Sequence, residues 1–169
     1  MNEQPKVAVI MGSDSDFPAL HGCIAFLKKM DILVEVFVMS AHRTPDKAAE
    51  FASLADKNGF DCLIAAAGKA AHLAGVLAAH TVIPVIGVPI KASTLDGLDA
   101  LLSIVQMPKG IPVATVAIDG GDNAAILATQ ILALKYDYLK EKLYDMKTEM
   151  AEGVEKKNIK IKELAEEIR

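Results

Sequence analysis

Short apolar segments that alternate with helical patterns constrain the fold of this chain more than any other feature. Each segment is rich in aliphatic residues and is bounded by Gly, Pro or polar residues, which is typical of a strand. The expected strands are residues 7–11, 34–39, 62–67, 84–88 and 112–118. The expected helices include residues 17–29, 46–57, 97–105 and 124–134. Since strand and helix alternate five times, the sequence predicts an α/β fold with a five-stranded parallel sheet covered by helices on both faces.

The bulk composition fits one domain and argues against two classes of partner. A chain of 169 residues, 52% hydrophobic but only 5% aromatic, can build its core mainly from aliphatic side chains. The net charge of −4 argues against nucleic-acid binding and against a basic face that binds membranes. The apolar run at residues 61–88 is interrupted by Gly, Lys, His and Pro, so we expect no membrane span.

The two cysteines and the first residues of the sequence favour a location in the reducing cytoplasm. Cys23 and Cys62 fall inside an expected helix and an expected strand, and neither has a second ligand at metal-binding spacing. We interpret both as buried free thiols, which are typical of a reducing compartment. Residues 1–6 are polar and no apolar signal segment follows them. A cytoplasmic protein without a metal site is therefore expected.

The end of the chain differs from the rest in composition. Residues 135–169 are highly charged, and their apolar residues mostly recur at steps of three and four, which predicts an amphipathic helix broken near Gly153. The sequence thus divides into an α/β domain, residues 1–134, to which the motifs described below assign nucleotide binding and catalysis, and a helical tail, residues 135–169. The apolar stripe of the tail needs a covering surface, either on its own domain or on a neighbouring subunit.

The sequence Ser-Ala-His-Arg-Thr-Pro at residues 40–45 follows one expected strand and precedes an expected helix, with Thr44 as N-cap and Pro45 at the first helical position. Such loops lie at the carboxyl ends of parallel strands, where open α/β sheets bind ligands. Arg43 can hold a phosphate with its fork of N–H groups, and Ser40 can add a hydrogen bond. His42 can move a proton near neutral pH.

Two further loops are expected at the same edge of the sheet. Ser13, Ser15 and Asp16 follow the first strand; Ser15 or Asp16 could simply cap the next helix, or the loop could bind a ligand. The loop after the third strand, residues 68–75, is dominated by small residues, which permit either tight helix packing or the close approach of a flat ligand. His72, at the start of a helix, could be structural or catalytic.

Four motifs together resemble one known family. Gly-Ser-x-Ser-Asp at residues 12–16, the motif at residues 40–45, Ala-Ala-His-Leu at residues 70–73 and Ser-Ile-Val-Gln-Met-Pro at residues 103–108 match, in order and spacing, the N5-carboxyaminoimidazole ribonucleotide mutases of purine (IMP) biosynthesis. The resemblance runs from about residue 7 to residue 134. The helical tail, residues 135–169, carries no motif that is diagnostic of the family.

The resemblance implies a three-layer α/β/α subunit of the flavodoxin-like or Rossmann-like kind, assembled into a homo-octamer and using neither a metal nor an organic cofactor. The implied enzyme is an isomerase that moves the carboxylate of a small ribonucleotide from an exocyclic amine to ring carbon 4, giving 4-carboxy-5-aminoimidazole ribonucleotide. The resemblance implies that His42 is the acid/base. The implied substrate-binding residues are Ser13, Ser15, Asp16, Ser40, Arg43, Gly68, Ala70, Ala71, His72 and Leu73.

Two residues depart from the family pattern, which usually has glycine where this chain has Lys69 and proline where it has Ala74. Lysine adopts positive φ less readily than glycine, and it adds length and charge near the ligand. Lys69 could point to solvent, or it could reach the carboxylate and alter substrate choice. Two other functions stay open: direct carboxylation of aminoimidazole ribonucleotide by carbon dioxide, and a non-catalytic nucleotide-binding module.

Overall fold

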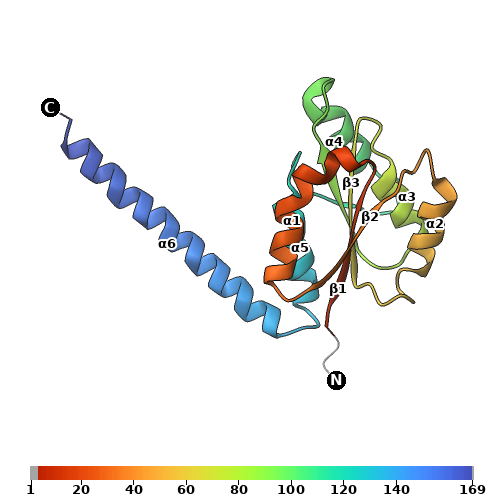
Figure 1. Ribbon diagram of the computed structural model, residues 1–169, viewed down its shortest axis with the longest axis horizontal. Helices are drawn as coiled ribbons and strands as arrows, with labels where there is room; N and C mark the ends of the chain where they lie inside the picture. Colours follow the sequence, from red (N-terminus) through yellow and green to blue (C-terminus); the bar gives the residue numbers. More distant parts are fainter. Residues whose placement is uncertain (1–3, 169) are drawn as a thin grey trace.

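The computed structural model describes residues 4–168, and its centre is a parallel sheet of five strands in the order β2-β1-β3-β4-β5 (Figure 1). The strands are β1 (Lys6–Met11), β2 (Leu33–Val38), β3 (Cys62–Gly68), β4 (Val85–Ile90) and β5 (Ala114–Thr115). The chain adds β2 on one side of β1 and then crosses to β3 on the other side. This reversal places a topological switch point between β1 and β3.

Helices cover both faces of the sheet, so the predicted three-layer α/β/α fold is confirmed (Figure 1). The helices are α1 (Phe17–Lys29), α2 (Pro45–Leu54), α3 (Leu73–His80), α4 (Leu98–Val105), α5 (Gly121–Leu132) and α6 (Tyr138–Glu166). Two short 3-10 turns, η1 (Asp14–Asp16) and η2 (Leu95–Gly97), precede α1 and α4. Helices α1 and α5 pack on one face, and α2, α3 and α4 pack on the other.

The alternation of side chains along β1 divides the core in two. Val7, Val9 and Met11 pack with α1 and α5, whereas Ala8 and Ile10 pack with the helices of the opposite face. Because successive side chains of a strand point to opposite faces, a strand between two helical layers has to be apolar throughout. The unbroken apolar run of β1 therefore follows directly from its central place in the sheet.

The fifth strand is much shorter than expected. Residues 112–118 were the predicted strand, but only Ala114 and Thr115 pair with β4. The carbonyl of Pro89 in β4 still accepts a hydrogen bond from the Asp119 N–H at 2.8 Å, but proline has no N–H to continue a regular ladder toward β5. The edge strand therefore ends after two residues.

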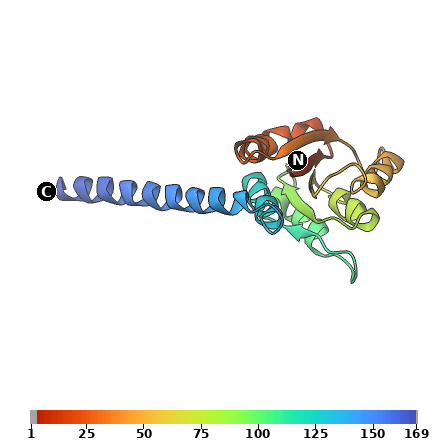
Figure 2. The same cartoon turned by 90° about the horizontal axis from the view of Figure 1, so that it is seen from below.

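Helix α6 is continuous, so the predicted break near Gly153 is wrong. A single glycine destabilises a helix by only about 1 kcal/mol relative to alanine, which the strong helix formers around it offset. The first turns of α6 pack on the domain through buried Leu139 and Leu143, and Lys142 pairs with Asp31 at 2.6 Å. Contact continues through Met146 to Glu149, which pairs with Lys29 at 3.4 Å, and beyond this point the helix projects away from the domain (Figure 2).

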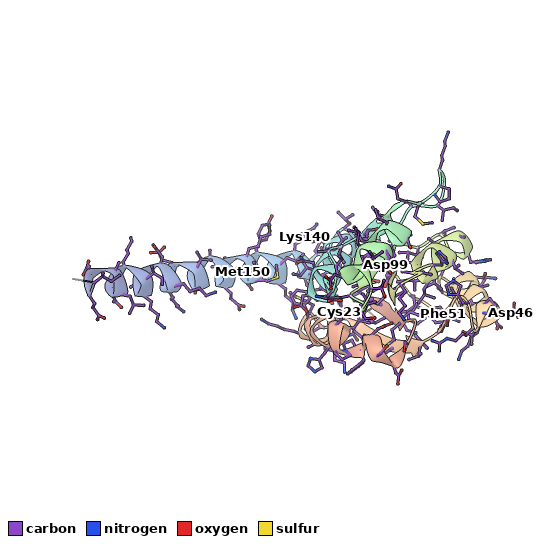
Figure 3. All side chains as sticks on the ribbon, turned by 90° about the horizontal axis from the view of Figure 1, so that it is seen from above. Cys23, Asp46, Phe51, Asp99, Lys140 and Met150 are labelled. Atoms are coloured by element: carbon purple, nitrogen blue, oxygen red, sulfur yellow. The ribbon has the colours of Figure 1, made fainter. Side chains whose placement is uncertain are left out.

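The projecting part of α6 carries exposed apolar residues, the first of which is Met150, near the point where the helix leaves the domain (Figure 3). Five other exposed large apolar residues follow it, the last of them just after the end of α6: Val154, Ile159, Ile161, Leu164 and Ile168. Its own domain therefore does not cover this stripe.

No helix within residues 4–168 combines the length and the apolar character that crossing a membrane requires.

Both cysteines are buried free thiols, as predicted. Burial raises the pKa of Cys23 to about 12 and that of Cys62 to about 12, because the thiolate form would lose its hydration. At neutral pH both side chains are therefore protonated, weakly reactive components of the core.

Candidate active site

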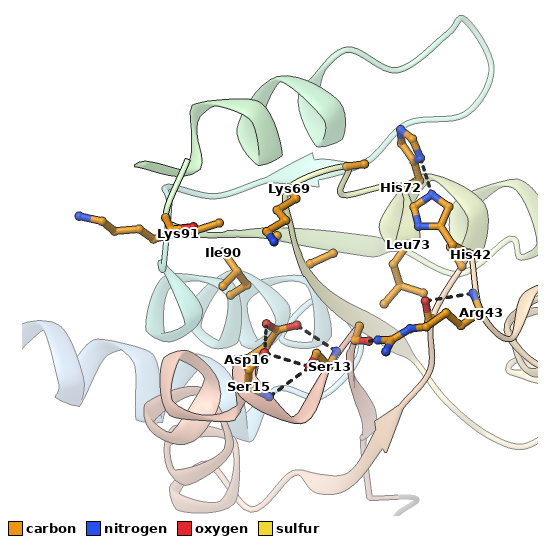
Figure 4. A pocket seen from close by; sticks show the side chains of 18 residues that line it. Ser13, Ser15, Asp16, His42, Arg43, Lys69, His72, Leu73, Ile90 and Lys91 are labelled. Atoms are coloured by element: carbon orange, nitrogen blue, oxygen red, sulfur yellow. Dashed lines mark hydrogen bonds between the residues drawn. The ribbon is translucent and has the colours of Figure 1, made fainter. Parts of the chain in front are cut away.

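A cleft of about 720 Å³ opens at the carboxyl ends of the strands, and the loops that follow β1, β2, β3 and β4 line it (Figure 4). It lies at the switch point between β1 and β3, the position where sheets of this strand order bind ligands. All of the sequence-predicted site residues line this cleft except Ala71, which is fully buried behind it. The topology therefore brings four loops, far apart in the sequence, to one place.

The loop after β1 forms a closed set of hydrogen bonds. The Ser13 hydroxyl accepts a hydrogen bond from the Ser15 N–H at 3.4 Å, and the Asp16 carboxylate accepts one from the Ser13 N–H at 3.1 Å. This capping box belongs to η1. Asp16 also stands at the N-cap position of α1, as one of the predicted alternatives had it, but its side chain makes no capping hydrogen bond to that helix. The Asp16 carboxylate points back into the loop because a 3-10 turn intervenes before α1.

Asp16 is a buried carboxylate at the cleft, with 8% of its surface exposed. Burial raises the pKa of its carboxyl group, and hydrogen bonds from Ser13, Ser15 and Gly12 oppose that rise. A partly desolvated carboxylate held by backbone donors is a strong, fixed acceptor. It suits a ligand that offers hydroxyl groups.

The loop after β2 is tied together by its own side chains. Thr44 precedes α2 and Pro45 is its first residue, as predicted, but the Thr44 side chain does not cap the helix. Instead, the Thr44 hydroxyl accepts a hydrogen bond from the Ser40 N–H at 3.0 Å, and the Ser40 hydroxyl accepts one from the Arg43 N–H at 3.2 Å. These bonds fix the backbone that carries His42 and Arg43.

Arg43 joins the β2 loop to the β1 loop. Its Nη2 donates a hydrogen bond to the Gly12 carbonyl at 2.9 Å, so the guanidinium lies across the end of β1 (Figure 4). A guanidinium has five N–H donors, and the remaining ones are available to an anion in the cleft. The arrangement suits a phosphate or a carboxylate.

His42 and His72 form a hydrogen-bonded pair, with 2.8 Å between Nε2 of His42 and Nδ1 of His72 (Figure 4). Their rings meet edge to face with centroids 5.0 Å apart. His42 comes from the β2 loop, and His72 directly precedes α3. In such a pair one nitrogen donates and the other accepts, so the protonation states of the two rings are linked.

The loop after β3 brings a residue in a left-handed conformation to the cleft. Lys69 has a φ of 56° and lines the cleft together with Gly68 and Ala70. Leu73 also lines it but is 2% exposed, so it forms part of the cleft floor.

Sequence reasoning missed the fourth loop, after β4. It contributes four residues to the cleft: Ile90, Lys91, Ala92 and Ser93. The rule that parallel strands present their carboxyl ends at one edge could have found this loop, because the fourth strand was predicted.

Within residues 4–168, no three His, Cys, Asp or Glu side chains gather as a metal site would require.

Comparisons with known proteins agree with the geometry. The N5-carboxyaminoimidazole ribonucleotide mutases of Pyrococcus horikoshii and Thermotoga maritima are 52% and 48% identical to this chain, over 96% and 95% of its length and 92% and 94% of theirs. The crystal structure of Treponema denticola PurE superposes with a TM-score of 0.83 at 26% identity, covering 94% of this chain and 99% of that one. The family model for AIR carboxylase matches residues 6–153. The chain therefore belongs to the AIR carboxylase family.

Proposed function

We propose that this chain is a mutase that converts N5-carboxyaminoimidazole ribonucleotide into 4-carboxy-5-aminoimidazole ribonucleotide. The observation that carries the proposal is the His42–His72 pair, 2.8 Å apart in a cleft that also holds Arg43. Binding a phosphate alone would not need the two imidazoles, whereas moving a carboxyl group between nitrogen and carbon needs a group that gives and takes a proton. The names of the relatives support the same reaction.

The nucleotide is held by the loops after β1 and β2. The phosphate is bound by the free N–H groups of Arg43, with the Ser40 and Ser13 hydroxyls as further donors. The ribose hydroxyls donate to the carboxylate of Asp16, which its loop already orients. With the sugar phosphate anchored there, the imidazole ring of the substrate extends toward the histidine pair.

His42 acts first as an acid and then as a base. Protonated His42 gives its proton to the exocyclic nitrogen as the nitrogen–carboxyl bond breaks, which yields carbon dioxide and aminoimidazole ribonucleotide. Ring carbon 4 then attacks the carbon dioxide, and His42 takes back the proton that leaves this carbon. The proton balance is zero over the cycle, so one residue can serve both steps.

His72 positions His42 for both steps. Its Nδ1 accepts a hydrogen bond when Nε2 of His42 carries a proton, and it can donate one when that nitrogen does not. The released carbon dioxide stays beside its acceptor because the cleft holds both fragments. Confinement of this kind makes a reaction between two molecules effectively unimolecular.

The proposal is tested by supplying the carbamate substrate and, in a separate reaction, aminoimidazole ribonucleotide with bicarbonate. We expect rapid formation of the ring-carboxylated product from the carbamate and slow formation from bicarbonate. Efficient use of bicarbonate would instead make the enzyme a direct carboxylase. Binding of both nucleotides without any turnover would make it a binding module.

We further propose that the chain works as a homo-octamer in the cytoplasm, with α6 packed on a neighbouring subunit. The exposed stripe on α6, including Met150, Val154 and Ile161, supports association because isolated apolar stripes of this length are unusual on a monomer. Light scattering of the full chain should report a mass close to eight subunits. The double variant Val154→Glu/Ile161→Glu should reduce that mass; a monomeric unsubstituted protein would contradict the proposal.

A further inference from the structure

Lys69 occupies a backbone position that disfavours it. Its φ of 56° lies in the left-handed region, where a residue with a Cβ is less stable than glycine by about 1 kcal/mol. The preceding strand β3 ends at Gly68, and Lys69 is the next residue into the cleft. A long cationic side chain is thus held in a strained conformation at the centre of the candidate active site.

The ammonium group of Lys69 is aimed into the cleft and is free. Figure 4 shows its side chain directed into the cleft, toward Ile90 and the β1 loop, whereas Lys91 extends away from the cleft. Lys91 forms an ion pair with Asp96 at 3.2 Å, but Lys69 forms none with any residue of the described part of the chain. A free cation inside a cleft that already holds Arg43 favours a ligand with two separate anionic groups.

The loop that carries Lys69 also carries the histidine partner. His72 lies three residues further on and contacts His42, so a single loop supplies the cleft with both the cation and the histidine partner. The phosphate donors belong to the β1 and β2 loops instead. A carboxyl group that moves between nitrogen and carbon has to lie beside the group that exchanges the proton.

We propose that Lys69 binds the migrating carboxyl group and sets a preference for carboxylated over uncarboxylated nucleotides. This inference rests on the proposed mutase function. The ammonium contacts the carboxylate of both the carbamate substrate and the ring-carboxylated product. Aminoimidazole ribonucleotide lacks that group and gains nothing from Lys69.

The test compares Lys69→Gln, which removes the charge but keeps a Cβ at the same φ, with Lys69→Arg, which keeps a charge. The readouts are KM for the carbamate and Kd, by calorimetry, for the ring-carboxylated product and for aminoimidazole ribonucleotide. We expect Lys69→Gln to weaken binding of both carboxylated nucleotides roughly five- to tenfold, as for a partly exposed charge-assisted hydrogen bond. Its Kd for aminoimidazole ribonucleotide should change less than about twofold.

Lys69→Arg should recover most of the affinity, and Lys47→Gln, an exposed lysine of α2 outside the cleft, should behave as the unsubstituted protein. Equal weakening of all three nucleotides would place Lys69 on the phosphate and overturn the inference, as would unchanged affinities. The calorimetric comparison does not depend on turnover. If the unsubstituted protein failed to convert the carbamate, the mutase function would be refuted. The Kd values for the ring-carboxylated product and for aminoimidazole ribonucleotide would still decide the role of Lys69.

Discussion

The two sides of the cleft are built differently. On one side, which we term the anchoring wall, the β1 loop at residues 12–16 and the side chain of Arg43 are joined by hydrogen bonds within the protein. On the other side, the reaction wall, His42 and His72 bond mainly to each other, and Lys69 is strained and free of ion pairs within the described residues. The anchoring wall is therefore held by hydrogen bonds between two loops, whereas the polar groups of the reaction wall have few partners in the rest of the protein.

His42 and Arg43 are neighbours in the sequence but serve opposite walls (Figure 4). Arg43 reaches back to Gly12, whereas His42 reaches forward to His72. The short, internally bonded loop between β2 and α2 permits this divergence, because Ser40 and Thr44 hold its backbone in place. Substitutions at these two adjacent positions should therefore separate catalysis from binding.

The largest expected effect is that of His42→Asn. The amide keeps a hydrogen-bonding group near His72 but cannot shuttle a proton, so we expect kcat to fall by roughly 10²–10⁴-fold while KM changes only a few-fold. Steady-state kinetics with the carbamate substrate gives both values.

The matched control is His80→Asn, a histidine at the end of α3 and outside the cleft, which should retain normal kcat. Near-normal turnover by the His42→Asn variant would contradict the assignment of His42 as the acid/base.

Arg43→Ala should act on binding instead. Losing charge-assisted hydrogen bonds to a phosphate should raise KM by roughly 10- to 100-fold, with a much smaller change in kcat. Arg43→Lys keeps the charge but loses the planar fork of N–H donors, so its KM should lie between that of the unsubstituted protein and that of Arg43→Ala. If KM stayed constant in both variants while kcat collapsed, the assignment of Arg43 to the anchoring wall would be wrong.

The pH dependence of nucleotide binding should report on Asp16. Burial raises the pKa of this carboxyl group, so it takes up a proton at a higher pH than an exposed aspartate would. The protonated form accepts ribose hydroxyls poorly, and affinity should therefore weaken several-fold as the pH falls through that raised pKa. Isothermal titration at a series of acidic pH values measures this.

The contribution of Asp16 to stability should change in the opposite direction. Because the folded state binds this proton more tightly than the unfolded state, the contribution is greatest at low pH and is lost as the pH rises through the folded pKa. Asp16→Asn should abolish both trends. Their persistence in that variant would assign them to another group.

The smallest expected effect is on stability and comes from the reaction wall. Lys69→Gly relieves a left-handed conformation but adds entropy to the unfolded chain, so we expect a net gain of roughly 0.5–1 kcal/mol. In a chain of this length that raises Tm by about 1–4 °C. Ala70→Gly, one residue further on and without a positive φ, should lower Tm instead. A lower Tm in both variants would show that Lys69 is not strained.

The sequence predicted the sheet and three of the four cleft loops because these depend on local patterns. Strands buried on both faces are continuously apolar, and polar residues directly after them fall at one edge by topology alone. The contact between His42 and His72 could not be predicted in this way, since it joins residues 30 positions apart and depends on how α3 begins. A lone histidine at the start of a helix, as His72 is in the sequence, is more often structural than catalytic.

The two wrong predictions of helix capping share a physical cause. Thr44 was correctly placed at the start of α2, but its hydroxyl bonds to Ser40, because a nearer partner within the loop competes with the helix N–H groups. Asp16 likewise bonds to its own loop and leaves α1 uncapped. The residue types correctly indicated that these side chains would accept hydrogen bonds from backbone N–H groups. Which N–H group donates depends on the conformation of each loop, which the sequence pattern does not specify.

The central claim is that the carboxyl group never leaves the cleft between the two walls. The most direct measurement supplies the carbamate substrate with a ¹³C-labelled carboxyl group in unlabelled bicarbonate buffer and determines the label in the product by mass spectrometry. Retention of nearly all of the label at ring carbon 4 is the result expected from trapped carbon dioxide. A product carrying the isotope composition of the buffer would show that the carboxyl group is released and recaptured, and it would contradict the account.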